Sequence, residues 1–382
     1  MVRRLFSVVL VGSMFAGIGC AAPPAEDADS AESADAVNEA AACNPLPERT
    51  TANIGDVTGM TAMEGTPFPS LGPDAAGYFH PPYGYTEGGT FAEPSDGKDG
   101  AWKVEAKDVD AAAPAGKLRV VEWNVERGNK LDKSIRLMKK KNADVWLLNE
   151  TDLYGKNSGG VVVAREIARA LGYSYYTGIE FYERRDDRRG TSGNAIVSRY
   201  PLTNTKSIDI PMLTAEGGHD WSKDSAEPRC GMRNAVSASI EAPGAAGPRT
   251  IDLVSLHTEN KANREVRLAQ FDHVVKELVT PGRPTVVAGD LNTLSPGEGP
   301  AFRKELEKRI AANGRDKSLF DCSRGDDTTT FSAALIVNMR IDWLLVQSGE
   351  GATVDCAPGS YEVQGNDRSS DHKPVVVEMT VK

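Results

Sequence analysis

Residues 284–292 read PTVVAGDLN, an apolar run that ends in polar residues of catalytic type. The apolar part, residues 284–288, predicts a buried strand, and a buried strand that runs into Asp or Asn opens at its tip onto a polar site. Asp290 and Asn292 lie two positions apart, so in an extended chain their side chains point the same way. We expect Asp290 to accept a proton from a bound water and Asn292 to hold that water or a substrate oxygen. An Asx turn after the strand is the alternative.

The same kind of strand ending recurs elsewhere along the chain. The other endings are Trp123-Asn124, Leu148-Asn149-Glu150, Gly193-Asn194, Ser255-Leu256-His257, Ile341-Asp342-Trp343 and Ser370-Asp371-His372. Each has a plain structural alternative when it is taken singly, such as a surface acid at Glu150, a core histidine at His257 or a turn asparagine at Asn194. Together they indicate strand tips that meet at one shared site.

From residue 117 the chain mixes strands and helices without strict alternation. We predict strands at 118–125, 144–148, 173–179, 193–198, 235–240, 251–257, 284–288, 340–346 and 374–379, and helices at 131–141, 161–171, 264–278 and 301–310. This mixture favours an α/β (α+β) sandwich, with two sheets inside and helices outside, over a parallel barrel.

The ordered set of motifs resembles the endonuclease/exonuclease/phosphatase family, the deoxyribonuclease-I-like metal-dependent phosphoesterases. The resemblance covers residues 117–382, and its most specific parts are GDLN at 289–292 and SDH at 370–372, placed around the Ile341-Asp342 pair. One departure is Asn149-Glu150, where Gln-Glu is commoner, but the acid is kept. The resemblance implies a four-layer α/β/β/α sandwich of two packed mixed sheets flanked by helices.

The resemblance also implies a metal site. Asn124, Glu150 and Asp371 would surround Mg²⁺, with Mn²⁺ or Ca²⁺ as alternatives and with one or two ions. The chemistry agrees, because hydrolysis of a phosphodiester needs its negative charge neutralised and its water aimed in line, and a hard carboxylate such as Glu150 suits Mg²⁺.

His257, Asp290, Asn292, Asp342 and His372 are the predicted catalytic residues. By resemblance, Asp342 orients His372, and either His372 or Asp290 is the general base; the sequence leaves this choice open. A protonated His257 would donate to a phosphate oxygen in the transition state.

Substrate contacts are predicted at Asn194, Arg184 and Arg185. The two arginines belong to ERRDDRR at 183–189, where four arginines near the site would grip flanking phosphates. The acids between them give an alternative, a salt-bridged surface loop. The threonines at 328–330 precede Phe331, where family members often carry a Thr-aromatic pair; a simple strand-forming run is the other reading.

The N-terminus predicts export. Residues 1–19 combine Arg3 and Arg4 with an apolar run that is too short to span a bilayer, as in a signal peptide. Gly19-Cys20 resembles a bacterial lipoprotein processing site, although Gly17 stands where Leu is usual, so both a lipid-anchored envelope protein and a secreted one are expected outcomes. Residues 20–42 are Ala-rich and acidic, as in a disordered tether, and residues 43–116 form a loop-rich extension.

The four cysteines after Cys20 are compatible with two disulfides in an oxidising compartment. Three pairings are open, and we favour Cys322 with Cys356 because their segments flank one predicted hairpin. The alternative is that all four cysteines, Cys43, Cys230, Cys322 and Cys356, are free and buried.

The net charge is −10, so the chain lacks the overall positive charge expected of a protein that coats nucleic acid. A polyanionic substrate would therefore be held locally, by a metal or a few arginines. The expected function is hydrolysis of phosphodiester bonds, of nucleic acid by an endonuclease-like enzyme or of a phospholipid headgroup by a sphingomyelinase-type enzyme. The alternative from another class is a non-catalytic surface binding protein. We expect a monomer, with an N-terminal lipid anchor as its link to the membrane.

Overall fold

The computed structural model describes residues 85–183, 190–294, 298–312, 319–333, 337–349, 354–365 and 368–382. The predicted signal peptide, the processing site at Cys20, the acidic tether, Cys43, Arg184 and Arg185 lie outside these ranges. Within them, no helix combines the length and the apolar character needed to cross a membrane.

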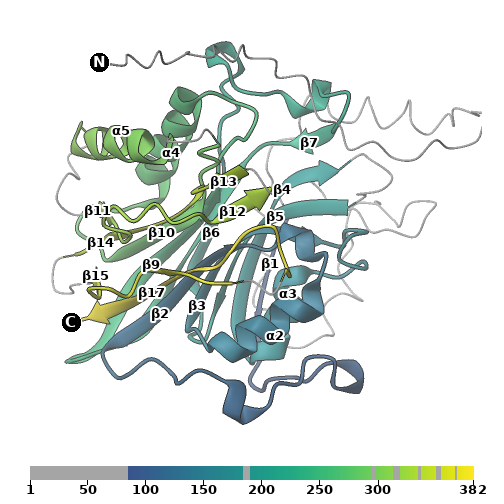
Figure 1. The fold of residues 1–382 in the computed structure, drawn as a ribbon, viewed down its shortest axis with the longest axis vertical. Helices are drawn as coiled ribbons and strands as arrows, with labels where there is room; N and C mark the ends of the chain where they lie inside the picture. The colour runs from purple at the N-terminus through teal and green to yellow at the C-terminus, as the bar shows by residue number, and fades with distance from the viewer. Residues whose placement is uncertain are drawn as a thin grey trace, which may run out of the picture. The chain divides into compact units, whose positions relative to one another are not determined.

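Two β-sheets form the centre of the described chain (Figure 1). Sheet A contains β1 (Thr86–Thr90), β2 (Lys117–Asn124), β3 (Val145–Leu153), β4 (Ser174–Glu183), β5 (Gly190–Ser198), β7 (Arg229–Gly231), β15 (Val354–Cys356), β16 (Glu362–Val363) and β17 (Val375–Val381). Sheet B contains β6 (Thr203–Asp209), β8 (Asn234–Gly244), β9 (Gly247–His257), β10 (Thr285–Asp290), β11 (Leu319–Asp321) and β14 (Asp342–Gln347). A separate ribbon pairs β12 (Phe331–Ala333) with β13 (Val337–Met339).

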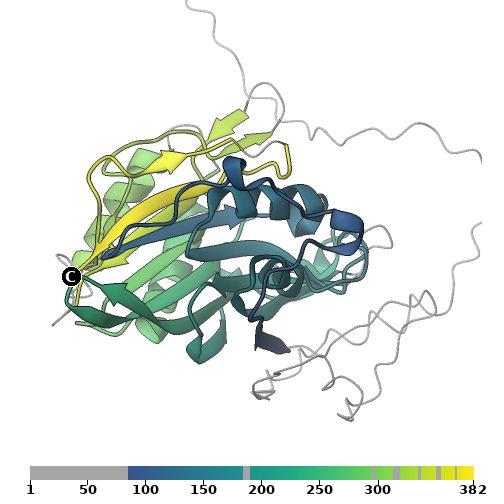
Figure 2. The ribbon, with the colours of Figure 1, turned by 90° about the horizontal axis from the view of Figure 1, so that it is seen from below.

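The order in sheet A is β1-β4-β5-β3-β2-β17-β15, with β7 beside β4 and β16 beside β17, and the order in sheet B is β11-β14-β10-β9-β8-β6. Both sheets are mixed, because β2 pairs parallel with β3 and β9 with β10, while their other neighbours run antiparallel. Figure 2 shows β2 (blue) beside β17 (yellow), although they lie at opposite ends of the described chain.

Residue alternation along the strands explains why the sheets stack. In β2, Leu118 and Val120 belong to the core between the sheets, whereas Val121 and Trp123 pack on the opposite face. That opposite face is covered by α2 (Leu131–Lys141) and α3 (Val163–Leu171). The outer face of sheet B is covered in the same way by α4 (Arg264–Leu278) and α5 (Glu298–Ala312). The predicted four-layer α/β/β/α sandwich is confirmed.

The end of the N-terminal extension packs against sheet A. Strand β1 adds to the sheet edge through antiparallel pairing with β4. Farther along, Trp102 is buried, and its indole Nε1 donates to Asp132 on α2 at 2.9 Å. Residues 85–116 thus contribute both a strand and a buried aromatic side chain.

The predicted Cys322–Cys356 disulfide is confirmed, with Cα atoms 5.6 Å apart. Cys322 directly follows β11 at the edge of sheet B, and Cys356 ends β15 at the edge of sheet A. The bond therefore joins the two sheets, whereas the sequence suggested two segments flanking a single hairpin.

Replacing Cys322 and Cys356 together by serine should lower the free energy of unfolding by about 3–4 kcal/mol, the value expected for a loop of 34 residues. The cost arises chiefly because the unfolded chain regains the freedom that the cross-link removes. Urea denaturation followed by circular dichroism measures it, and an unchanged unfolding midpoint in a folded variant would contradict the prediction.

Candidate active site

The layer between the sheets changes from apolar to polar towards one end. Along β2 the inward positions are Leu118 and Val120, followed by Glu122 and Asn124. Along β9 they include Leu253, followed by Ser255 and His257. Because strand side chains alternate with a period of two, these polar residues face the same interior as the core that precedes them. The polar inward positions of the other central strands are Asn149 on β3, Asn194 on β5, Asp290 on β10 and Asp342 on β14.

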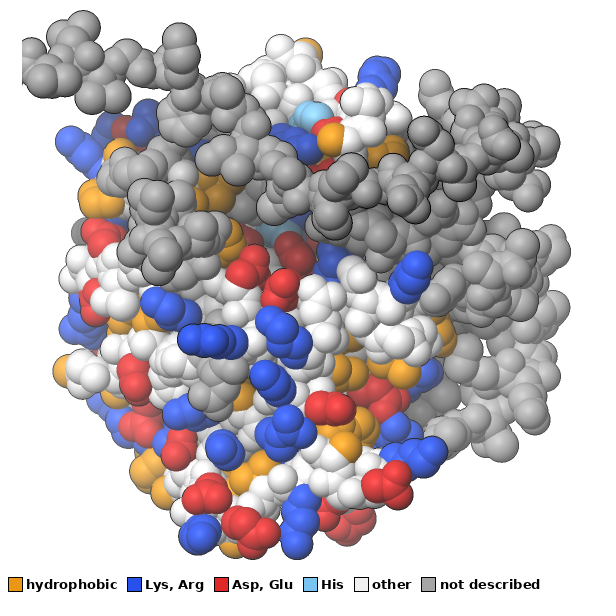
Figure 3. All heavy atoms as spheres, turned by 45° about the vertical axis from the view of Figure 1, so that its right-hand side comes forward, with side chains coloured by type: hydrophobic (Ala, Val, Ile, Leu, Met, Phe, Trp, Pro, Cys, Tyr) orange, Lys and Arg blue, Asp and Glu red, His pale blue; other side chains and the backbone are white. Residues whose placement is uncertain are grey.

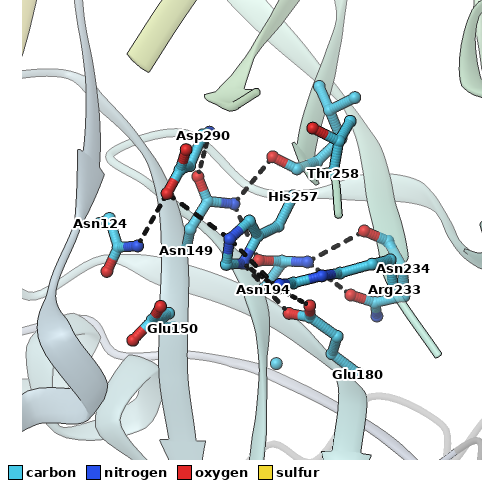
Figure 4. Close-up of polar contacts among 12 residues, drawn as sticks. Asn124, Asn149, Glu150, Glu180, Asn194, Arg233, Asn234, His257, Thr258 and Asp290 are labelled. Atoms are coloured by element: carbon cyan, nitrogen blue, oxygen red, sulfur yellow. Dashed lines mark hydrogen bonds and ion pairs between the residues drawn. The ribbon is translucent and has the colours of Figure 1, made fainter. Parts of the chain in front are cut away.

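Asn149 cross-links the two sheets at this polar end (Figure 4). Its Nδ2 donates to Asn194 Oδ1 at 2.8 Å, and to the Leu256 carbonyl of sheet B at 3.0 Å. Its Oδ1 accepts from the Asp290 backbone N–H at 2.8 Å. The asparagine that departs from the commoner family residue thus fixes the distance between Asp290 and sheet A.

Glu150 reaches the site through an irregularity in β3. The β3–β5 register shifts between Leu148 and Thr151, and Glu150 has φ +51°, a left-handed conformation that turns its side chain away from regular alternation. Burial would raise the pKa of Glu150, but Arg127, whose Nε lies 3.9 Å away, and the two site histidines bring that pKa down to about 2. Glu150 is therefore an anion at neutral pH.

Glu150, Asp371 and Glu126 form an acidic corner at the mouth of the site. Partial burial raises the pKa of Asp371 to about 6; His372 opposes this, and the like charges of Glu150 and Glu126 reinforce it. The side chains of Glu150 and Asp371 are 28% and 45% exposed, so water reaches them. Crowded, hydrated carboxylates are the donor set that Mg²⁺ prefers, and a divalent cation would relieve their repulsion. The chemistry of these donors therefore suits such an ion, whereas the His and acidic side chains of the described residues whose ligand atoms lie within 4.8 Å of one another are Asp290, Asp342 and His372.

Asn124 lies beside this corner, with both ends of its amide in use. Its Nδ2 donates to Asp290 Oδ2 at 3.2 Å, and its Oδ1 accepts from the Glu126 backbone N–H at 3.0 Å. The side chain thus connects the acidic corner to Asp290.

His372 and Asp342 form a buried pair. The imidazole Nδ1 lies 3.0 Å from each oxygen of the Asp342 carboxylate. Thr330 Oγ1 accepts from the backbone N–H of Asp342 at 3.1 Å, and the Phe331 ring packs against the imidazole with centroids 4.9 Å apart. Burial would lower the pKa of His372, but Asp342, helped by Asp290 and Asp371, raises it to about 10.

Asp290 lies between the two histidines of the site. Its Oδ2 is 3.5 Å from His257 Nε2 and 3.7 Å from His372 Nε2, while its Oδ1 accepts from the Asn292 backbone N–H at 2.9 Å. Burial raises the pKa of Asp290; the histidines oppose this shift, and Asp342 adds to it. The Asn292 side chain turns towards the Thr258 carbonyl, to which its Nδ2 donates at 2.9 Å.

Two charged residues that the sequence reading missed hold His257. Its Nδ1 lies 3.4 Å from Glu180 Oε2 and 3.0 Å from Arg233 Nη1, and Arg233 also pairs with Glu180 (Figure 4). Burial alone would raise the pKa of Glu180, but Arg233 and His257 hold it below its usual value. Both residues lie beside predicted strands: Glu180 follows Ile179, the last residue of one, and Arg233 stands two positions before Ala235, the first residue of another. A search for polar residues next to these strand ends would therefore have found them.

The predicted site residues that the structure describes lie in one region. They are Asn124, Glu150, Asn194, His257, Asp290, Asn292, Asp342, Asp371 and His372. Arg184 and Arg185 lie outside the described residues. On the face drawn in Figure 3, acidic side chains gather beside a recess in which a histidine is visible.

This chain is similar in sequence to a family model and in structure to several solved proteins. A family model described as "Endonuclease/Exonuclease/phosphatase family" matches residues 121–372. Among curated proteins, none matches the sequence. An endonuclease/exonuclease/phosphatase from Beutenbergia cavernae DSM 12333 is similar in structure, at 20% identity and TM-score 0.50, over 69% of this chain and 72% of that chain.

Two further solved structures are less similar. The human Nocturnin catalytic domain with bound sulfate anion has 17% identity and TM-score 0.48, over 70% of this chain and 94% of that one. D. rerio TDP2 complexed with single strand DNA product has 18% identity and TM-score 0.45, over 69% of this chain and 98% of that one.

Proposed function

Because this chain belongs to the endonuclease/exonuclease/phosphatase family, whose members hydrolyse phosphoester bonds, we propose that it is a divalent-metal-dependent phosphodiesterase that cleaves the backbone of nucleic acids. The observation that carries the proposal is the position of Asp290, between His257 and His372 and next to the acidic corner. At this point the buried acid can accept a proton, and the two imidazoles beside it can stabilise the negative charge of a phosphate.

Glu150 and Asp371, with Glu126 beside them, would hold the metal ion. When bound, a divalent ion would neutralise charge on the phosphoryl group and polarise its oxygens. Asn124 positions Asp290 relative to the acidic corner, because its amide is hydrogen-bonded to both the Asp290 side chain and the Glu126 backbone.

Asp290 accepts the proton of the attacking water. Its Oδ1 is fixed by the Asn292 N–H, and its Oδ2, which accepts from Asn124 Nδ2, faces the two imidazoles. The raised pKa of Asp290 makes it a stronger base than an ordinary carboxylate. His372, held by Asp342, keeps its positive charge and stabilises the negative charge that develops on the phosphoryl oxygens.

His257 and Arg233 bind the phosphate from the other side. Arg233 is 3% exposed and is fixed by Glu180, so its charge is already in place before substrate arrives. His257 donates to a phosphate oxygen, and Asn194, which Asn149 holds, supplies a further polar contact.

Chelation with EDTA should abolish hydrolysis of bis-p-nitrophenyl phosphate, and Mg²⁺ or Mn²⁺ should restore it, as measured by p-nitrophenolate release. Glu150→Gln keeps the shape but removes the charge, so it should raise the Mg²⁺ concentration for half-maximal activity at least about tenfold. Turnover that continues at the same rate in chelator would end the metal proposal.

The substrate class is tested by offering plasmid DNA and sphingomyelin vesicles to the same preparation with Mg²⁺. We expect DNA cleavage that weakens as salt rises, because phosphate binding releases counterions, and no release of phosphocholine. Lipid cleavage without DNA cleavage would favour the sphingomyelinase-type alternative. Failure to hydrolyse DNA, lipid and the small diester would favour a non-catalytic binding protein.

A further inference from the structure

Trp221 is a buried tryptophan in a segment that is otherwise largely exposed. It begins η5 (Trp221–Lys223), a short 3₁₀ turn between β6 and β8, and it is 0% exposed, whereas Ser222 and Lys223 are exposed. Its side chain takes no part in the apolar cores that the described residues form between the sheets and beneath the helices. The burial of this large ring therefore needs another explanation, which its neighbours supply.

The segment that carries Trp221 connects the two sheets beside the site. It leaves β6 of sheet B, adds β7 to β4 of sheet A, and returns to β8 of sheet B (Figure 1). Phe181 of β4 pairs with Gly231 of β7, and Arg233 follows two residues later. The connection therefore passes next to the residues that hold His257.

Three cations lie around the Trp221 ring. The Arg229 guanidinium lies 4.2 Å from the ring centre, and the Lys261 ammonium lies 4.6 Å from it. The Arg233 guanidinium lies 5.8 Å from the same centre and 5.1 Å from the centre of the Phe181 ring, which packs edge-on against the indole. Because the face of an aromatic ring is negative, it attracts cations, so the two rings support the Arg233 side chain.

The indole N–H of Trp221 holds an acid that faces the same arginine. Nε1 donates to Glu259 Oε2 at 2.7 Å, and this oxygen lies 3.7 Å from Arg233 Nε, beyond hydrogen-bonding distance. The other oxygen of Glu259 accepts from the Lys261 backbone N–H at 3.0 Å. A Glu259 carboxylate without the indole would compete with Glu180 for the guanidinium, because arginine pairs readily with carboxylates on more than one edge.

We propose that Trp221 is a positioning residue for Arg233. Its ring supports the guanidinium, and its indole N–H keeps Glu259 from drawing that guanidinium away from Glu180 and His257. Arg233 Nη1 pairs with Glu180 and lies 3.0 Å from His257 Nδ1, so a shift of the guanidinium would disturb the contacts that bind phosphate. The inference rests on the proposed function and deepens it, because it assigns the residue that holds Arg233 in place for the phosphate.

Two substitutions separate the ring from its N–H. Trp221→Leu removes both, so the dissociation constant for inorganic phosphate, measured by isothermal titration calorimetry with Mg²⁺ present, should rise about tenfold. Trp221→Phe keeps a ring without the N–H, so the rise should be about threefold. KM for bis-p-nitrophenyl phosphate should rise with the dissociation constant, while kcat changes less. A residue that only stabilised the fold would lower the amount of active protein and leave both constants unchanged.

Trp102→Leu is the matched control. Trp102 is also buried, its indole N–H also donates to a carboxylate, that of Asp132, and the Arg169 guanidinium lies 5.5 Å from its ring. It belongs to the core beneath α2 and α3, away from the layer that holds the site. Its loss should leave the phosphate dissociation constant and KM at their wild-type values.

A double variant tests whether Trp221 acts through Arg233. Arg233→Lys keeps the charge but loses the planar guanidinium, so by itself it should weaken phosphate binding. Adding Trp221→Leu to Arg233→Lys should then change the dissociation constant by less than about twofold. If Trp221→Leu does not fold, Trp221→Phe in the same two backgrounds decides the matter. A loss as large in the Arg233→Lys background as in wild type, or wild-type constants in a folded Trp221→Leu protein, would overturn the proposal.

The binding measurement does not depend on turnover. A wild-type protein that binds phosphate more tightly than Trp221→Leu does, but hydrolyses no phosphodiester, would refute the proposed function and leave the role of Trp221 standing. Hydrolysis of DNA by a protein whose phosphate affinity and KM do not respond to Trp221→Leu would refute this inference alone.

Discussion

Replacing Asp290 by asparagine should lower kcat for bis-p-nitrophenyl phosphate by about 10²- to 10⁴-fold, with a much smaller change in KM. The amide has the shape of the carboxylate but cannot accept a proton from water. It can still accept from the Asn292 N–H, so the local backbone should keep its 2.9 Å contact. The loss would therefore report proton acceptance rather than collapse of the site.

Asp132→Asn provides a matched control for this measurement. Asp132 lies on α2 and accepts from the Trp102 indole, which an asparagine oxygen can also do. The control should keep wild-type kcat. Wild-type kcat in a folded Asp290→Asn protein would remove Asp290 from the role of base and direct attention to His372.

Replacing His372 by alanine should lower kcat by about 10²- to 10³-fold, the usual loss when a fixed electrostatic stabiliser of the transition state is removed. Asp342→Asn should weaken the same stabilisation, because Asp342 is what keeps the imidazolium charged and oriented. The double variant should lose less than the product of the two single losses, since the residues act as a unit.

His273→Ala is the control for the loss of an imidazole. His273 lies on α4 with its Nε2 3.2 Å from the Asp209 carbonyl oxygen, and it takes no part in the site. Single-turnover kinetics with saturating Mg²⁺ gives the comparison. Strictly multiplicative effects of His372→Ala and Asp342→Asn would show that the pair does not work as proposed.

Local sequence patterns predicted much of the secondary structure and many of the site residues. The motif GDLN at the end of an apolar run, and the motifs ID and SDH at the start of two others, indicated which residues meet. The helix predicted at 264–278 matches α4 residue for residue. The strands that the pattern missed are mostly short or at sheet edges, such as β1, β7 and β16. Such strands bury little surface of their own, so their sequences carry weak alternation and their pairing is settled by the neighbouring strand.

The sequence by itself determined the mixture of strands and helices and the polar residues at the strand ends, because alternation along one strand is a local property of the backbone. The four-layer stacking was implied by the resemblance to the family. Only the tertiary structure decided which charges face each other. Register between distant strands brought Asp342 opposite Asp290, a bulge turned Glu150 towards the site, and Arg233 came to lie against His257. Glu122 illustrates the difference: its inward direction follows from its place on β2, but its acidic neighbours come from sheet B, where they follow from how the two sheets stack.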